Sequence, residues 1–457
     1  MLEPANQADV VIVGAGVAGL AAAHRLTSAG ITTAVLEAAP YPGGRMSTEK
    51  VDGFRLDRIG QLLSTSYPEL RRTPALDALA LRSFAPGVLL HSDGRRHRAG
   101  ALTGPTSARR ARGALHAVRA LASAPRCSAG RGAPTVPRAR AGAPLGTAVD
   151  QARLGAALAR LASAPVERLL ARPEAPAAQA LAERGIPART IDGFLRPLLA
   201  ALLYDPELTT SSRCADLALH AFAGGRLCLP EGGAEALPEL LARSLPPSTV
   251  HTGVRVTSIA TTAVTTAEHG EIRCRAVLLA TDARTAAELL PGLRVPGFHR
   301  VTVLHHTMDE APATGASLLL DADRSGPVAH TAVISRVDPS RAPAGRALVT
   351  STVLGTPPPD VDTAVRTHLA RLYGTSTARW ETLAVHHTPE AVPAMTAPHD
   401  LRRPVRLLAG LYVCGDHRDT STVQGALHSA RRATTAILSD LGAAGSLHSA
   451  EPLRSAA

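Results

Sequence analysis

Three closely spaced glycines near the start of the chain constrain its fold more than any other feature. Asp9–Val13 (DVVIV) is a short apolar, β-branched run, which is typical of a strand buried on both faces. The segment GAGVAG (14–19) follows at once, and Leu20–Ala29 is rich in helix formers. A second apolar run, Ile31–Leu36, ends in Glu37. The sequence therefore predicts one βαβ unit within about thirty residues.

Each glycine of this motif has its own physical task. Gly14 permits a tight turn after the strand, Gly16 lets the backbone approach a pyrophosphate, and Gly19 lets the helix pack on the strand. The N-terminus of the helix then offers unpaired N–H groups and a positive dipole end to the phosphates. Glu37, at the end of the second strand, is placed to accept hydrogen bonds from a ribose diol. The unit predicts dinucleotide binding, and by itself it leaves NAD and FAD open.

Further motifs extend this pattern. The segment APYPGGRM (39–46) carries a glycine pair that brings backbone close to a ligand, and an arginine that can neutralise phosphates. LYVCGD (411–416) and QGAL (424–427) stand near the C-terminal end. With these motifs the sequence resembles the flavin-containing amine oxidase superfamily, which includes protoporphyrinogen oxidases and phytoene-desaturase-like enzymes. The resemblance covers about the first sixty residues, 190–295 and 380–440.

The resemblance implies that the cofactor is FAD and assigns residues to it. Gly60 and Gln61 match the stretch beside the flavin ring, and the backbone of Val256 matches the contact to the adenine. Gly415 and Asp416 match the strand end at the ribityl and phosphate portion. The last helix would point its first N–H groups at the pyrimidine side of the flavin. The full set expected to bind FAD is Gly14, Gly16, Gly19, Glu37, Gly44, Arg45, Gly60, Gln61, Val256, Gly415, Asp416, Gln424, Gly425 and Ala426.

The sequence departs from the amine oxidases of this superfamily in three ways. They keep a lysine that holds a water against the flavin, whereas Lys50 is the only lysine here and lies next to the nucleotide-binding segment. They also surround the amine with two aromatic rings; Trp380 and Tyr412 occupy the matching stretches, but a true second ring near the flavin is not evident in this sequence. Pro389 stands where some members carry a cysteine bonded to the flavin. We therefore expect tightly bound, non-covalent FAD.

Two other segments, 194–213 and 221–242, look more like the desaturase and protoporphyrinogen oxidase branch. In that branch the substrate is bulky and apolar, and the protein mainly aligns the donor carbon at ~3–3.5 Å from the ring that takes the hydride. The sequence predicts a FAD-dependent oxidoreductase that dehydrogenates a hydrophobic small molecule, with oxygen or a quinone-like acceptor. Two alternatives remain: a flavin amine oxidase that releases hydrogen peroxide, and a non-catalytic carrier on the same fold.

Candidate substrate residues are few. His387, shortly before the last predicted flavin strand, could abstract a proton or orient a substrate, and Trp380 and Tyr412 could contact it. No side chain is assigned a catalytic role. The five cysteines are odd in number and show no C-x-x-C spacing, so neither a disulfide framework nor a metal site is expected.

The predicted fold is α/β, with a Rossmann-type FAD-binding domain (GR2-like) and an inserted α+β substrate domain. The FAD-binding domain is expected to comprise 1–62, 224–295 and 405–445, the substrate domain 63–223 and 296–404, and the tail 446–457. The region 62–223 is expected to be mostly helical, 227–245 to be a turn and a helix, and 330–337 to be a strand.

The charge of the chain is unevenly spread. Net charge is +11, and the stretch 94–149 alone holds eleven arginines with no acidic residue. Because the rest is balanced, nucleic-acid binding is not expected, although the stretch could rest on anionic lipid at about 1 kcal/mol per arginine. Solvated arginines are the alternative. With no signal-peptide pattern and no run of ~18 apolar residues, we expect a cytoplasmic protein, at most peripheral to a membrane.

Overall fold

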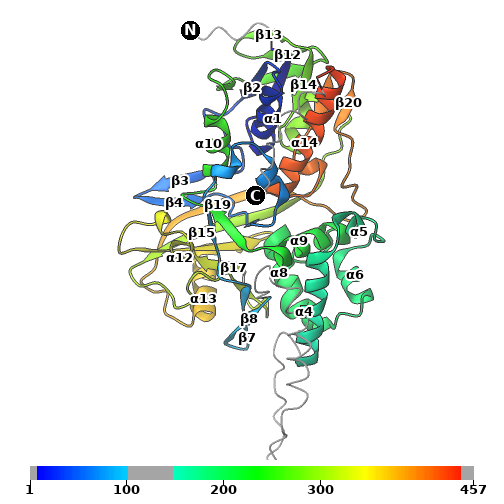
Figure 1. The fold of residues 1–457 in the computed structure, drawn as a ribbon. Helices are drawn as coiled ribbons and strands as arrows, with labels where there is room; N and C mark the ends of the chain where they lie inside the picture. Colours follow the sequence, from blue (N-terminus) through cyan, green and yellow to red (C-terminus); the bar gives the residue numbers. More distant parts are fainter. Residues whose placement is uncertain (1–7, 101–147, 444–457) are drawn as a thin grey trace, which may run out of the picture.

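The computed structural model describes residues 8–100 and 148–443. Figure 1 shows two layered regions: a parallel sheet with α1 and α14 at the top, and below it a mixed sheet beside a group of helices. The long strands β15 (Phe298–Met308) and β19 (Glu381–Pro393) run across the middle of the molecule.

The first region is built on a six-stranded sheet whose core strands are apolar along their whole length. All four residues of β1 are buried, and β1 pairs in parallel with β2 and β14, as DVVIV predicts. Only β20 runs antiparallel to its neighbour. In spatial order the strands are β10 (Val250–Thr252), β2 (Thr33–Glu37), β1 (Val10–Val13), β14 (Ala276–Leu279), β21 (Leu411–Val413) and β20 (Arg406–Leu408).

Helices α1 (Val17–Ser28) and α14 (Val423–Asp440) cover one face of this sheet and pack against each other. Small buried residues such as Ala22 and Ala430 let the two helices approach closely. The other face packs on a smaller antiparallel sheet. The remaining elements here are β11 (Val256–Ile259), β12 (Ala263–Thr266), β13 (Gly270–Arg273), α10 (Ala236–Arg243) and α11 (Ala283–Leu289).

The second region contains a seven-stranded mixed sheet. Its two long strands pair antiparallel, and the fourth and fifth strands continue the sheet toward a hairpin. The strand predicted over 330–337 ends at Val333, where a helical turn, α12 (Ile334–Val337), begins. In spatial order the strands are β19, β15, β18 (Ala347–Leu354), β17 (Val328–Val333), β16 (Leu319–Asp321), β7 (Val88–Ser92) and β8 (Arg95–Ala99).

The prediction of mostly helical structure over 62–223 is wrong for its first part, which forms strands. Strands β7 and β8 are joined by Asp93 and Gly94, both at positive φ. An Asp-Gly pair in this conformation makes a two-residue hairpin turn, so this dipeptide was the local signal for strands. The other short elements are β3 (Thr48–Val51), β4 (Phe54–Asp57), β5 (Leu63–Ser64), α2 (Pro68–Arg72), a 3-10 turn η1 (Leu76–Ala78), β6 (Leu81–Ser83) and β9 (Leu227–Pro230).

The part from 148 onward is helical, as the sequence predicts. Its helices pack around a core that includes Phe194, Leu198 and Leu219 and that extends beneath the mixed sheet. They are α4 (Ala148–Ser163), α5 (Val166–Leu170), α6 (Ala177–Glu183), α7 (Ala188–Thr190), a π-helical turn η2 (Ile191–Leu195), α8 (Arg196–Leu203) and α9 (Ser212–Gly224). Helix α13 (Val361–Tyr373) covers the far face of the mixed sheet, and two 3-10 turns complete the fold, η3 (Pro339–Arg341) and η4 (Asp416–Arg418).

Candidate functional site

The N-terminus of α1 opens directly after β1, and its glycines sit where only glycine fits. Gly14 adopts φ +102°, which side-chain-bearing residues rarely adopt. A Cβ on Gly19 would lie 2.0 Å from the carbonyl oxygen of Gly14, so the helix can approach the turn only with glycine there. A Cβ on Gly16 would meet nothing within 4 Å. The helix therefore begins at a backbone surface with free space in front of it.

This helix start has the properties of an anion site. Gly16 is the N-cap residue and supplies no side chain to the first N–H groups. A parallel bridge joins Gly16 to Gly43, whose N–H donates to the carbonyl of Ala15 at 2.9 Å. The glycine pair predicted to approach the ligand is thus held beside the first turn of α1. Uncapped N–H groups and the helix dipole together favour a phosphate here.

Glu37 lies at the end of β2 next to the same turn. Its Oε2 accepts a hydrogen bond from the N–H of Ala15 at 2.7 Å, and its Oε1 accepts from the N–H of Ala39 at 2.9 Å. Each carboxylate oxygen can accept more than one hydrogen bond, so the group can still accept from a ribose hydroxyl. The N–H of Val254 bonds the carbonyl of Glu37 at 2.9 Å. Val256 follows two residues later, at the start of β11.

Replacing Glu37 by glutamine is expected to weaken FAD binding about tenfold, since a charged acceptor for the ribose becomes neutral and about 1.4 kcal/mol corresponds to a factor of ten. Quenching of flavin fluorescence during titration of the apoprotein measures this. The control is Glu310→Gln, which neutralises an exposed carboxylate in the segment that follows β15. Equal affinities of the two variants would argue against a ribose contact.

The other end of the predicted FAD site is formed by the turn at Arg45, by Asp416 after β21 and by the loop at Gly60. Arg45 pairs with Asp416 at 2.7 Å and donates to the carbonyl of Ala391 at 3.0 Å. Burial works against the charge of Arg45, but the Asp416 carboxylate outweighs it and holds the arginine pKa above its usual range. Gly415, at φ +140°, donates its N–H to Ser429 at 2.9 Å. The predicted residues 44–45 and 415–416 are therefore brought together.

The start of α14 completes this end. Gln61 donates from its amide to the carbonyl of Ser421 at 3.1 Å, which places the loop at 60 against the start of the helix. The N–H of Gly425 is taken by the hydroxyl of Thr422 at 3.2 Å, and that of Ala426 by the carbonyl of Thr422. The side chain of Gln424 accepts from the N–H of Glu69 at 3.0 Å. Two of the three residues predicted to offer N–H groups to the flavin thus have partners within the protein.

A cavity lies beside Gly60, between the loop after β4 and the inner face of the mixed sheet. It leaves about 30 Å³ open to the centres of water molecules. Its wall is mostly apolar, with polar groups from β15, β17 and β18. The lining includes Asp57, Gly60, His305, His330, Arg341 and Thr350.

The polar groups of the cavity wall differ in how far the protein satisfies them. Asp57 pairs with Arg341 at 2.8 Å, and although burial raises the pKa of this carboxyl, Arg341 outweighs it and keeps the pKa low. His305 donates from Nε2 to the carbonyl of Asp57 at 3.0 Å, so its Nδ1 accepts from the hydroxyl of Thr350 at 2.9 Å. His330, by contrast, is buried and its Nδ1 has no partner among the described residues. Of the two cavity histidines, His330 is therefore the one with an unpaired ring nitrogen.

Both cavity histidines are neutral at physiological pH. Burial lowers the pKa of His330 to about 4. Burial also lowers the pKa of His305 to about 4, although Asp57 acts in the opposite direction. The cavity therefore presents uncharged imidazoles, which can accept or donate a hydrogen bond without adding charge.

The residues predicted to meet the substrate do not line this cavity. His387 is exposed on β19 and bonds Thr302 at 2.9 Å, while its neighbour His386 points inward and packs edge-on against His305 with ring centroids 5.5 Å apart. Trp380 is buried in the core against Tyr373, and the hydroxyl of Tyr412 bonds Asp440. The rings of Trp380 and Tyr412 therefore pack within the protein. His386 faces the interior where the sequence pointed to His387, and only the direction of side chains along the strand could have distinguished the two.

Two further expectations concern surfaces. In the described part of the chain no helix has both the length and the apolar character that a membrane crossing needs. Most of the arginine-rich stretch falls in 101–147, which lies outside the described residues. The predicted tail at 446–457 also lies outside them.

The fold and the glycine turn define a dinucleotide-binding α/β protein, and comparisons with known proteins extend this. The sequence profile of the family described as flavin containing amine oxidoreductase matches residues 17–438. Putrescine oxidase of Kocuria rosea is 44% identical over 100 residues, which are 21% of this chain and 20% of that protein. This curated relative is thus matched over about a fifth of its length.

Solved structures match over a much longer span at low identity. An oxidoreductase from Methanosarcina mazei superimposes with a TM-score of 0.68 at 15% identity, covering 93% of this chain and 99% of that one. Cyclohexylamine oxidase from Brevibacterium oxydans gives 0.65 at 18% identity, covering 95% and 99%. At such identities these structures show a shared fold. Because the family profile matches nearly the whole chain, the protein belongs to the flavin-containing amine oxidoreductase family.

The family is one of flavin-containing oxidoreductases, and the residues predicted to bind FAD have features that suit this cofactor. The uncapped start of α1 and the free space at Gly16 suit the pyrophosphate, and Glu37 suits the ribose. At the other end, a Cβ on Gly60 would meet no protein atom within 4 Å, and both ring nitrogens of buried His417 lack partners among the described residues. These are groups that a bound FAD would satisfy or cover.

Proposed function

We propose that the protein dehydrogenates a small, mostly apolar molecule that carries one hydrogen-bonding group, and that this group enters the cavity beside Gly60. The observation that carries this proposal is that His330 is the one polar lining residue with a ring nitrogen that lacks a partner among the described residues. Specificity of this kind comes from a buried group that only the right ligand can pair. When bound, non-covalent FAD supplies the acceptor for the hydride that leaves the substrate carbon.

The same proposal assigns roles to the chain. Twelve of the fourteen residues predicted for FAD hold it, from the start of α1 to Gln424 at the start of α14, whereas the N–H groups of Gly425 and Ala426 bond Thr422. The segments 1–62, 224–295 and 405–445 form the FAD-binding domain, and 63–223 with 296–404 form the substrate domain. The cavity wall excludes water and aligns the donor carbon, which is a proximity effect that needs no charged side chain. His330 orients the substrate, and oxygen or a quinone-like compound reoxidises the cofactor.

Anaerobic bleaching of the flavin absorbance tests this proposal. A panel of small apolar alcohols, amines and cyclic compounds with a removable hydride should contain members that bleach the flavin, each with a rate that saturates with concentration. If no member of the panel bleaches the flavin of a protein that binds FAD, the proposal that small molecules donate a hydride from this cavity is wrong.

Replacing His330 by leucine is expected to lower kcat/KM for such a substrate about 10- to 100-fold, because the substrate's polar group would lose its only buried partner. The flavin spectrum and FAD affinity should not change. The matched control is His387→Ala, whose side chain points away from the cavity. If His387→Ala lowered kcat/KM and His330→Leu did not, the assignment of the cavity would be wrong.

Amine oxidation with release of peroxide is the second candidate. It is supported by the family and by the likeness to putrescine oxidase and cyclohexylamine oxidase. Neutral imidazoles in an apolar wall also favour the uncharged form of an amine. The missing lysine and the packed position of Trp380 count against a mechanism like that of the superfamily's amine oxidases. Peroxide formed with primary or secondary amines, and with no other substrate class, would decide for this candidate.

A further inference from the structure

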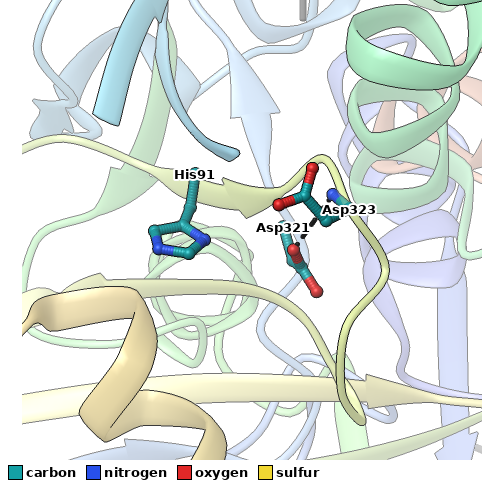
Figure 2. Close-up of side chains that lie close together, drawn as sticks. All are labelled: His91, Asp321 and Asp323. Atoms are coloured by element: carbon teal, nitrogen blue, oxygen red, sulfur yellow. Dashed lines mark hydrogen bonds between the residues drawn. The ribbon is translucent and has the colours of Figure 1, made fainter. Parts of the chain in front are cut away.

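A second cluster of chemically active side chains lies at the edge of the mixed sheet, and none of its members lines the cavity beside Gly60. His91 and Asp321 are partners in the parallel pair of β7 and β16, and Asp323 follows two positions later. Parallel strands bring their carboxyl ends to the same edge, so the three side chains converge (Figure 2). One nitrogen or oxygen of each lies within 4.8 Å of the others.

His91 is the unusual member of this cluster. Its side chain is buried, with 7% of its surface exposed, and neither ring nitrogen has a hydrogen-bond partner among the described residues. In Figure 2 the ring of His91 lies beside the two carboxylates, and no hydrogen bond joins it to either. A neutral imidazole always carries one N–H and one lone pair, and leaving both unpaired inside a protein is unfavourable. His91 therefore lacks a hydrogen-bond partner among the described residues.

The carboxylate of Asp321 is held in place by donors behind it. Ser325 donates from its N–H to Oδ2 at 2.6 Å. The Nδ1 of His368 accepts from the N–H of Val328 at 3.1 Å, so its Nε2 carries the proton and faces the same Oδ2 at 3.2 Å. A buried histidine is thus fixed in the tautomer that orients Asp321.

Asp323 is oriented in the same manner from the other strand. Its Oδ1 accepts from the hydroxyl of Ser92 at 2.7 Å, and its Oδ2 accepts from the N–H of Asp93 at 2.8 Å. Hydrogen bonds from surrounding groups to carboxylates are what fixes the ligands of metal sites. Oδ2 of Asp321 is fully occupied by its donors, but Oδ1 accepts only the N–H of Asp323 at 3.1 Å. This oxygen and both oxygens of Asp323 keep a second lone pair, so both carboxylates can still bind an ion.

We propose that His91, Asp321 and Asp323 bind a divalent transition-metal ion that ties β7 to β16. One imidazole with two carboxylates suits Zn²⁺ or Mn²⁺, whereas Mg²⁺ and Ca²⁺ prefer oxygen ligands alone. Small side-chain rotations would bring the three ligand atoms to about 2.0–2.2 Å from a central Zn²⁺, and water would complete the coordination. The ion would give His91 the partner it lacks.

Calorimetric titration of the full, FAD-loaded chain with ZnCl₂ and with MnCl₂, after removal of metals by a chelator and of any affinity tag, tests this proposal. We expect one ion per chain, an affinity at least 100-fold weaker in Asp323→Asn and in His91→Ala, and a 10- to 100-fold weaker affinity in His368→Gln. The control is His269→Ala, which removes an exposed histidine from a distant hairpin and should bind like the wild type.

Two outcomes would overturn the proposal: no binding of either ion by the wild type, or binding that Asp323→Asn leaves unchanged. Asp323 is exposed, so its variant decides the matter even if His91→Ala does not fold. Thermal unfolding gives a second readout, since an ion that binds only the folded chain raises Tm in the wild type and not in Asp323→Asn. Neither readout depends on the oxidation reaction.

Discussion

Replacing Gly16 by valine should reduce FAD binding at least 100-fold and leave the protein folded. A Cβ at this position meets no protein atom within 4 Å, and Gly16 does not adopt a positive φ. The side chain would instead project into the space in front of the first N–H groups of α1. Losing two charge-assisted hydrogen bonds to the phosphates, at about 1.5–3 kcal/mol each, accounts for a change of this size.

Equilibrium titration of the apoproteins with FAD, together with circular dichroism of the fold, checks this prediction. Gly155→Val is the matched control, because a Cβ on Gly155, which lies in α4, would also meet no protein atom within 4 Å. The control should bind FAD like the wild type. A folded Gly16→Val protein that binds FAD with unchanged affinity would contradict the placement of the pyrophosphate.

Acidification from pH 6.5 to pH 4 should remove a large part of the folding stability. The pKa values of His305 and His330 are lowered from 6.5 to about 4 by burial. Between these values the unfolded chain binds more protons than the folded one, so the free energy of unfolding falls as the pH falls. Each histidine contributes roughly 3 kcal/mol to this loss, against a total stability of about 5–15 kcal/mol for an ordinary domain.

Urea unfolding of the FAD-loaded protein at pH 7, 6, 5 and 4 measures the effect. His330→Gln isolates one histidine, because glutamine does not titrate and the imidazole has no hydrogen bond that the change would break. The difference in unfolding free energy between the variant and the wild type should shift by roughly 3 kcal/mol in favour of the variant from pH 7 to pH 4. A difference that stays constant over this range would mean that His330 takes up its proton at the same pH in the folded and the unfolded chain, so that burial does not lower its pKa.

The part of the fold that the sequence predicts best is the part set by local signals. A β-branched strand, three glycines at fixed spacing and a run of helix formers specify the first βαβ unit, and the structure has β1, α1 and β2 there. The parallel sheet also takes β14 and β21 from the other predicted segments. At 81–99 the expectation failed, because the Leu/Ala periodicity that supports helices lies further along the chain, at 151–203, whereas the local signal here is the Asp93-Gly94 turn.

The substrate side could be predicted much less well, because it depends on strand direction and register. His386 and His387 are adjacent in sequence, and only the pairing of β19 with β15 decides that His386 faces the interior. His330 has no motif around it and gains its role from the cavity. His91 and Asp321 meet through a parallel pairing across more than two hundred residues, which no local pattern indicates.

A crystal structure of the protein with FAD tests the central claim most directly. The pyrophosphate should lie against the N–H groups at the start of α1, the ribose of the adenosine should lie within hydrogen-bond distance of Glu37, and the isoalloxazine should reach from Gly60 to the start of α14 with the cavity of His330 open to its face. An isoalloxazine separated from Gly60 by protein side chains, or phosphates bound away from α1, would contradict the account.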